Sequence, residues 1–180
     1  MNKKGFSLIE LLAVIIILGI VATIGISAVS GYVQDSRKST FADLAKLYAE
    51  KASEDRAKDR LPHDIKDGEA ILLPIEKYVL EKNEDFSTPY GQLSLDYCYV
   101  IITNNKNNFY YYLYLLDDTN HAIVAEEYSK IGKDSVTIEA SEIAKILNYR
   151  SINATSVLEI DGTNYVLKTH NGQYVVLEKE

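Results

Sequence analysis

An acidic residue, Glu10, lies inside the most apolar stretch of the chain. Between Phe6 and Val29 the polar exceptions are Ser7, Glu10, Thr23 and Ser27. Burying a carboxylate near the start of a membrane helix costs roughly 2–3 kcal/mol, so such a residue usually has a partner. Cleavage of the chain after Gly5 would create a positive partner at similar depth, the α-amino group of Phe6. Glu10 is therefore the main candidate for a functional side chain, and ion pairing is its chemistry.

Two partners are open to Glu10 under this interpretation. Within one helix, Phe6 and Glu10 are four residues apart, which allows a local pair. The amine of a neighbouring subunit could instead approach the carboxylate. That second pairing would set the stagger between two parallel helices, so it would give Glu10 a role in assembly.

The rest of the chain contains no recognisable catalytic or metal-binding pattern. The three histidines, His63, His121 and His170, lie far apart and have no nucleophile motif beside them, and no glycine-rich loop could cradle a phosphate. Cys98 is the single cysteine, so an internal disulfide is impossible, and we expect it to be a small buried hydrophobic side chain. We therefore expect no catalytic residue, no metal, no cofactor and no enzymatic activity.

Two polar motifs remain ambiguous. Asp117 and Asp118 could help to hold calcium together with Asn120, but a turn between strands favours the same residue types without a metal. Residues 153–155, Asn-Ala-Thr, match a glycosylation sequon.

Length and charge limit the possible partners. The chain has 180 residues, which suits one globular head and one extended element. The net charge is −7, and loss of Lys3 and Lys4 with a cleaved leader would make the remainder still more acidic. Because an acidic surface repels phosphate backbones, we do not expect the bulk of the head to bind nucleic acid.

The apolar stretch has the length of a membrane span. Twenty-four residues at about 1.5 Å each cover about 36 Å, and the hydrocarbon core of a bilayer is about 30 Å thick. Lys3 and Lys4 should stay in the cytoplasm, so the remainder would project outward. A secretory signal cleaved after the apolar stretch, near Ala28 and Ser30, and a plain single-pass anchor are the alternatives. Glu10 argues against both.

Residues 3–12, Lys-Lys-Gly-Phe-Ser-Leu-Ile-Glu-Leu-Leu, resemble the processing and assembly signature of type IV prepilins and type II secretion pseudopilins. The following Ala-Val-Ile-Ile-Ile-Leu-Gly-Ile continues the likeness, which covers about residues 1–50. The resemblance implies cleavage between Gly5 and Phe6 by a prepilin peptidase, and N-methylation of Phe6. It also implies that Glu10 registers the incoming subunit in a filament. Ser27 stands where the family often has proline.

The resemblance implies a particular course for the protein. The precursor would be a single-pass cytoplasmic membrane protein with its head outside, surrounded by lipid before assembly. An inner-membrane assembly platform and other pilin subunits would then be its partners in a surface filament for adhesion, motility or aggregation. A pseudopilin of a type II secretion or DNA-uptake system is an alternative within the family. A membrane-anchored binding domain that never polymerises is an alternative of another class.

The elements that position these residues begin with one long helix, expected over residues 6–60. Residues 1–5 form the leader, 6–30 the transmembrane or filament-core part and 31–60 an amphipathic continuation. The apolar stripe of that continuation is Phe41, Leu44, Ala45, Tyr48 and Ala52, with Val33 on roughly the same face. Pro62 predicts an end near Arg60. Two helices broken near Gly31 are the alternative.

Residues 61–180 are expected to form the head. A connection over 61–94 holds the three prolines, and Pro74 is expected in the first turn of a short helix through about Lys82. Strands are predicted at 95–103 and 109–116, joined by a long polar turn, and a third at 121–126. The tyrosines at 110–112 and 114 are typical of a half-buried strand, although a sticky exposed surface is possible.

The C-terminal third is expected to contain a short helix and three more strands. Residues 139–148 resemble a helix whose inner face is Ile143, Ala144, Ile146 and Leu147. Strands are predicted at 156–160, 164–169 and 173–178. Asp161-Gly162 and Asn171-Gly172 are the turn signals, and the second predicts a two-residue hairpin. The predicted class is α+β, a pilin-like fold in which the long helix packs on an antiparallel sheet.

Overall fold

The computed structural model describes residues 7–77 and 86–180, without the side chains of residues 24–28. The chain divides into two compact units, an N-terminal unit that ends at Arg37 and a C-terminal unit, Lys38–Glu180. The helix α1 runs without interruption from Leu8 to Ala57, so the predicted long helix is confirmed and the break near Gly31 is not present.

The helix α1 ends in a Schellman motif. Asp59 has a φ of 55°, in the left-handed region. The amide of Arg60 donates to the carbonyl of Asp55 at 2.8 Å, and the amide of Asp59 donates to the carbonyl of Arg56 at 3.1 Å. The end at Ala57 therefore comes earlier than Pro62 predicted, because the left-handed Asp59 terminates the helix before the proline can act.

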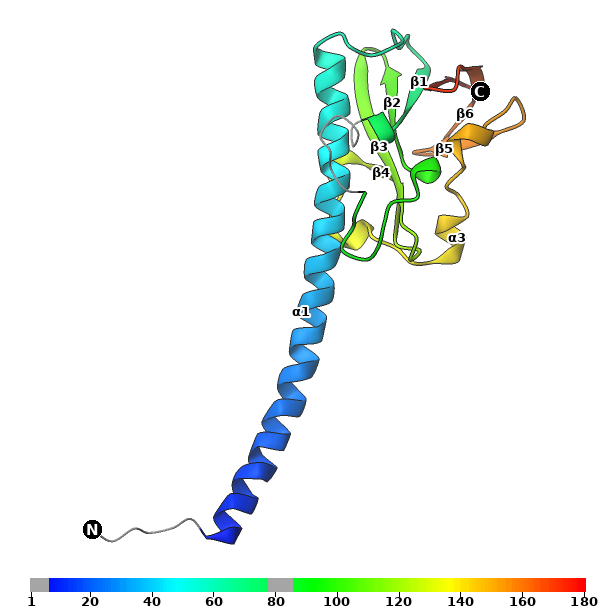
Figure 1. Cartoon of the computed structure of the whole chain (residues 1–180). Coiled ribbons are helices and arrows are strands. Elements are labelled where there is room, and N and C mark those ends of the chain that lie inside the picture. Colours follow the sequence, from blue (N-terminus) through cyan, green and yellow to red (C-terminus); the bar gives the residue numbers. More distant parts are fainter. Residues whose placement is uncertain (1–6, 78–85) are drawn as a thin grey trace. The chain divides into compact units, whose positions relative to one another are not determined.

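The C-terminal unit is built around one antiparallel sheet of seven strands (Figure 1). Its strands are β1 (Glu69–Pro74), β2 (Tyr99–Asn105), β3 (Asn108–Leu116), β4 (Ala122–Glu127), β5 (Val157–Ile160), β6 (Thr163–His170) and β7 (Val175–Lys179). Their order in the sheet is β4-β3-β2-β1-β7-β6-β5. The predicted α+β class is confirmed.

The strand β1 corrects the prediction for the connecting segment. It lies at the centre of the sheet between β2 and β7, although the sequence placed it in a loop. Pro74 is the last residue of this strand and not the first turn of a helix. Its missing amide is tolerated there because the strand ends at that point. Glu76 and Lys77 are helical, and the rest of the predicted helix, residues 78–82, lies outside the described residues.

The predicted hairpin of β2 and β3 is confirmed, but its turn is shorter. Asn105 pairs with Asn108, so only Lys106 and Asn107 lie in the turn. Both have positive φ, 52° and 67°, as a type I′ turn requires. The prediction of a long polar turn was wrong because the asparagines continue the ladder. The start of the strand predicted over 95–103 also differs. Leu95–Tyr97 forms a 3₁₀ turn, and β2 begins only at Tyr99.

The other predicted strands are present with small shifts. The two-residue hairpin signal at Asn171-Gly172 was wrong, because His170 pairs with Val175 and four residues form that loop. The two-residue turn is instead Asp161-Gly162, whose φ angles are 49° and 70°. The helix predicted over 139–148 is a single turn, α3 (Ala140–Ile143), and Ala144 is exposed.

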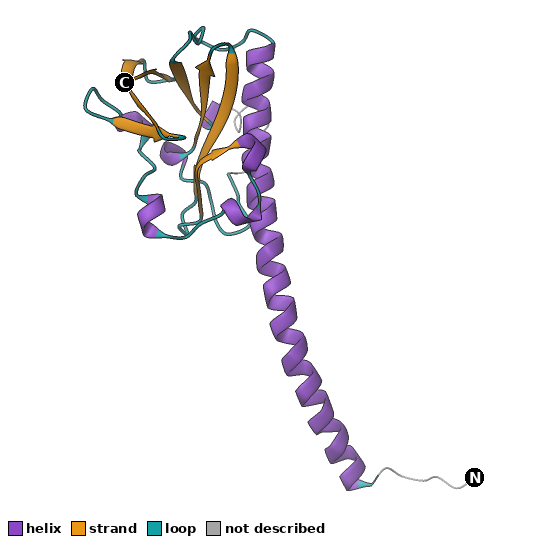
Figure 2. Cartoon of the chain, turned by 180° about the vertical axis from the view of Figure 1, so that it is seen from behind, coloured by secondary structure: helices purple, strands orange, loops and turns teal. Residues whose placement is uncertain are grey.

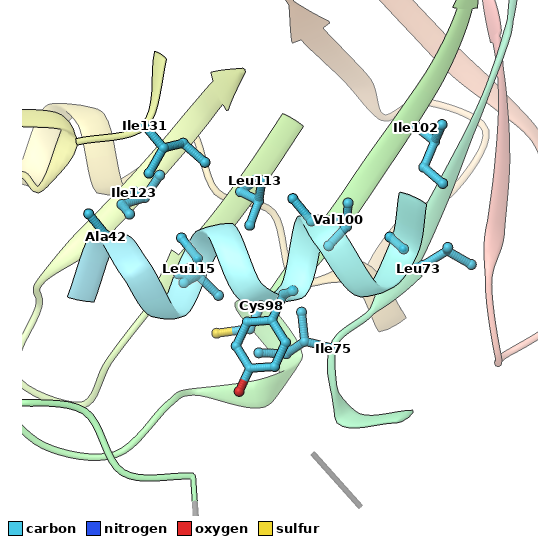
Figure 3. Close-up of a cluster of buried hydrophobic side chains, with 14 of the residues drawn as sticks. Ala42, Leu73, Ile75, Cys98, Val100, Ile102, Leu113, Leu115, Ile123 and Ile131 are labelled. Carbon is cyan, nitrogen blue, oxygen red and sulfur yellow. The ribbon is translucent and has the colours of Figure 1, made fainter. Parts of the chain in front are cut away.

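Two hydrophobic clusters lie on the two faces of the sheet. On one face the predicted stripe of α1, extended by Ala42 and Ala49, packs against side chains of β1 to β4 (Figure 3). On the other face, Ile146, Tyr149 and Ile152 cover Tyr99, Tyr114 and their neighbours. Figure 2 shows the segment that contains α3 on the side of the sheet away from α1. The tyrosine-rich strand β3 is half-buried, as predicted, since Tyr112 and Tyr114 are buried and Tyr110 is exposed.

Candidate assembly site at the start of the N-terminal helix

Ser7 and Glu10 form a capping box at the start of α1. The amide of Ser7 donates to Oε2 of Glu10 at 2.9 Å, and the amide of Glu10 lies 3.3 Å from the hydroxyl of Ser7. The two side chains thus reciprocally contact backbone amides of the first turn, and the amide of Glu10 also donates to the carbonyl of Ser7 at 3.1 Å. Gly5 and Phe6, the predicted cleavage and methylation residues, lie outside the described residues.

Sequence reasoning assigned Glu10 an assembly role and missed this local one. The signal was present, because Ser-Leu-Ile-Glu matches the Ser-x-x-Glu pattern of a capping box. The box holds the carboxylate beside the N-terminus of the helix, where the macrodipole favours negative charge. Among the described residues, Oε1 of Glu10 accepts no hydrogen bond. One oxygen is therefore engaged in the cap, and the other remains able to accept from a further donor.

The described side chains of the N-terminal unit expose apolar surface on all sides of the helix. The large apolar residues from Leu8 to Val21 are between 46% and 85% exposed, and Val29, Tyr32 and Val33 are exposed as well. A helix that is apolar all round needs a non-aqueous environment or a protein partner. Within the part of the chain whose side chains are described, no helix has a stretch long and apolar enough to cross a membrane.

The histidines lie in three separate environments. Nε2 of His63 is 3.0 Å from Oε2 of Glu69, and the ring of His121 stacks on Tyr90 at 3.6 Å. Nε2 of His170 is 3.0 Å from the carbonyl oxygen of Tyr149. In residues 7–77 and 86–180, no group of three or more acidic, histidine or cysteine side chains could hold a metal ion.

The carboxylate of Asp117 organises a turn. Its Oδ1 accepts from the amides of Thr119 and His121, each at 2.9 Å, and from the Thr119 hydroxyl at 2.8 Å. Its Oδ2 accepts from the hydroxyl of Thr88 at 3.1 Å. These donors occupy the oxygens that a calcium ion would need, so the metal-free interpretation of this turn fits the geometry.

Cys98 and Asn153 also have local roles. Cys98 is buried between α1 and the sheet, as predicted, and burial raises the pKa of its thiol to about 12. Oδ1 of Asn153 accepts from the amide and the hydroxyl of Thr155 at 2.9 and 2.7 Å. The sequon therefore coincides with a turn in which the asparagine side chain caps the backbone.

Comparison with known proteins supports one class for the N-terminal segment. Residues 1–26 match the family model of the prokaryotic N-terminal methylation motif. The match supports a prepilin of the type IV pilin or pseudopilin type, and such proteins are typically structural rather than enzymatic. No curated protein and no solved structure matches the chain.

Proposed function

We propose that the chain is a structural subunit of a type IV pilus filament. The observation that carries the proposal is the methylation motif at residues 1–26, which is continuous with the exposed apolar helix. In this proposal the precursor is anchored in the cytoplasmic membrane through residues 6–30. A prepilin peptidase cleaves it after Gly5 and Phe6 is N-methylated.

Assembly would then transfer the apolar helix from lipid into the core of a filament. Because the helix leaves lipid and not water, close packing between neighbouring helices, and not the hydrophobic effect, would stabilise the polymer. The second carboxylate oxygen of Glu10, Oε1, would accept from the α-amino group of a neighbouring Phe6 while Oε2 stays in the cap. In hydrocarbon neither charge has water or another partner to bind, so the pairing of the carboxylate with the amine would set the register between subunits.

A pseudopilin of a type II secretion or DNA-uptake system is the second candidate, because the same methylation motif supports it equally. Abundance and filament length, observed by electron microscopy, separate the two. A membrane-anchored binding domain that never polymerises is the candidate of another class.

The first experiment is mass spectrometry of the protein isolated from its native membrane or filaments. We expect a mature chain that begins with N-methylated Phe6. A chain that retains Met1, or one cleaved near residue 30, would overturn the proposal, because neither product could place the amine beside Glu10.

The second experiment separates the charge of Glu10 from its role in the cap. Glu10→Gln removes the charge but keeps a side chain that can close the capping box. Ser7→Ala removes half of the box and keeps the charge, and Glu10→Ala removes both. We expect both Glu10 variants to be cleaved normally and to be lost from filaments at least tenfold, and Ser7→Ala to assemble with a smaller loss.

Filament incorporation is measured by immunoblotting of sheared filaments against the total cellular pool. Normal incorporation of Glu10→Gln would show that the cap, and not the ion pair, is the function of this residue. Normal incorporation of Glu10→Ala would remove Glu10 from the mechanism altogether.

A further inference from the structure

A polar cleft of about 200 Å³ opens at one end of the sheet face that lies away from α1. It lies between the β2–β3 hairpin and the turn that joins β5 to β6. Four side chains form its floor, Thr103, Tyr112, Ile160 and Tyr165, which are 4%, 5%, 2% and 7% exposed. Asn105, Tyr110, Asp161 and Thr163 form the accessible rim. The cleft is independent of the N-terminal helix and of the proposed assembly site.

The polar groups of the floor are incompletely satisfied by the protein. The Tyr112 hydroxyl has one side-chain partner, Oδ2 of Asp161, at the long distance of 3.4 Å. Within the described residues, the hydroxyls of Thr103 and Tyr165 make no side-chain hydrogen bond. Among the described residues, none of these three hydroxyl oxygens is both closed off from solvent and without a hydrogen-bond partner, so those that lack a protein partner reach water in the cleft. A ligand hydroxyl could replace that water.

The charge of the cleft restricts what those partners can be. Among the described residues, no lysine, arginine or histidine lines it, so a phosphate or carboxylate would find no counter-charge there. Asp161 is the one carboxylate among the described lining residues, whereas calcium takes about 6–8 oxygen ligands and usually several carboxylates. Burial, together with the neighbouring Asp161, raises the pKa of the Tyr112 phenol, which therefore keeps its proton. That proton is donated to Asp161, and the phenol oxygen can accept from a ligand. The lining suits a neutral ligand with many hydroxyl groups.

We propose that this cleft binds one sugar ring of a neutral carbohydrate. The exposed ring of Tyr110 at the rim would contact the apolar face of the sugar, and the hydroxyl, amide and carboxylate groups of the lining would bond the sugar hydroxyls. Pockets for drug-sized ligands run from about 300 to 1,000 Å³, so a cleft of about 200 Å³ fits a single ring at the end or side of a glycan.

The test uses the full chain in a detergent without a sugar headgroup, such as lauryldimethylamine oxide. Saturation-transfer-difference NMR is recorded with methyl β-D-glucopyranoside, methyl β-D-galactopyranoside and N-acetylglucosamine, each at millimolar concentration. We expect transfer to at least one of the three. Tyr165→Phe and Thr103→Val, which remove single hydroxyls with little change of shape, should each weaken that binding about fivefold. Tyr128→Phe, at an exposed tyrosine outside the cleft, should leave it unchanged.

Circular dichroism checks that each variant is folded. Asp161→Asn serves as the second probe if a floor variant fails to fold, because asparagine tolerates the left-handed conformation of this position, whose φ is 49°. Absence of transfer from all three sugars would overturn the proposal. Saturation transfer that is undiminished in both Tyr165→Phe and Thr103→Val would also overturn it. The same holds if Tyr128→Phe weakens the binding as much as the floor variants do.

Discussion

The two halves of α1 differ in what their apolar side chains contact. In the first half, the large apolar residues from Leu8 to Val21 are all exposed. In the second half, Phe41, Ala45 and Tyr48 are at most 1% exposed, since they pack against the sheet. Both halves have the same secondary structure, so helix formation alone does not say which half stabilises the fold and which serves an interaction.

This difference teaches how one helix can have two functions. An apolar stripe of about one face buries itself against a single sheet, whereas a helix that is apolar all round needs neighbours on every side. The apolar side chains of the second half are buried within the chain. Those of the first half have no such cover among the described residues, and in the proposed filament lipid or other subunits would supply it.

The largest expected effect comes from placing the same charge in each half. Ala45→Asp buries an unpaired carboxylate in the cluster beneath α1 and should destabilise the C-terminal unit by about 3–5 kcal/mol or more. Ile16→Asp should leave the urea midpoint of this unit unchanged and should abolish recovery in filaments. Urea unfolding, followed by near-ultraviolet circular dichroism of the tyrosines, measures the first effect.

Ser39→Asp is the control for that pair, because Ser39 is an exposed position of the second half. It should change stability by less than about 0.5 kcal/mol. A loss of stability in Ile16→Asp equal to that in Ala45→Asp would contradict the division of α1 into a folding half and an assembly half.

An intermediate effect is expected from Glu69, which lies in β1 and is 4% exposed. Burial raises the pKa of its carboxyl, but hydrogen bonds from Lys168, at 2.7 Å, from His63 and from the amide of Lys66 outweigh it and lower the pKa to about 2. Because the folded pKa lies below the ordinary 4.5, the stabilisation is complete above pH 4.5 and is lost as the pH falls toward 2.

The Glu69→Gln variant tests this pH dependence. At pH 7 it should be less stable than the wild type by at most about 3 kcal/mol, and the difference should shrink between pH 4.5 and 2. Urea unfolding at steps from pH 7 to about 2.5 measures it. A difference that stays constant over this range would show that the carboxylate charge is not what stabilises β1.

The smallest effect concerns the β2–β3 turn, where Lys106 has a φ of 52°. Lysine pays a steric cost in this conformation, and asparagine adopts it more readily. Lys106→Asn should therefore stabilise the C-terminal unit by about 0.5 kcal/mol, while Lys106→Gln should have no effect. A change of thermal midpoint that is the same for both variants would contradict the type I′ explanation.

The parts of the fold that local patterns specify were predicted well. The β2–β3 hairpin, the position of β4 and the apolar stripe of α1 all follow from periodicities that extend over a few residues. The strand β1 was missed because its short apolar run, which ends in Pro74, shows no period that separates a buried strand from a buried helix segment. Only β2 and β7, which are distant in the sequence, supply its hydrogen bonds.

The sequence by itself determined the leader signature and the position of Glu10 in a helix, because each depends on neighbours within about two helical turns. The structure decided that this helix continues past Gly31. The Ser7–Glu10 capping box was equally local and could have been predicted. The tertiary structure alone decided the central position of β1 in the sheet and the lowered pKa of Glu69. It also decided which residues line the cleft, among them Thr103, Tyr112 and Tyr165. These depend on contacts between residues far apart in the chain, and local preferences do not specify which distant strands meet.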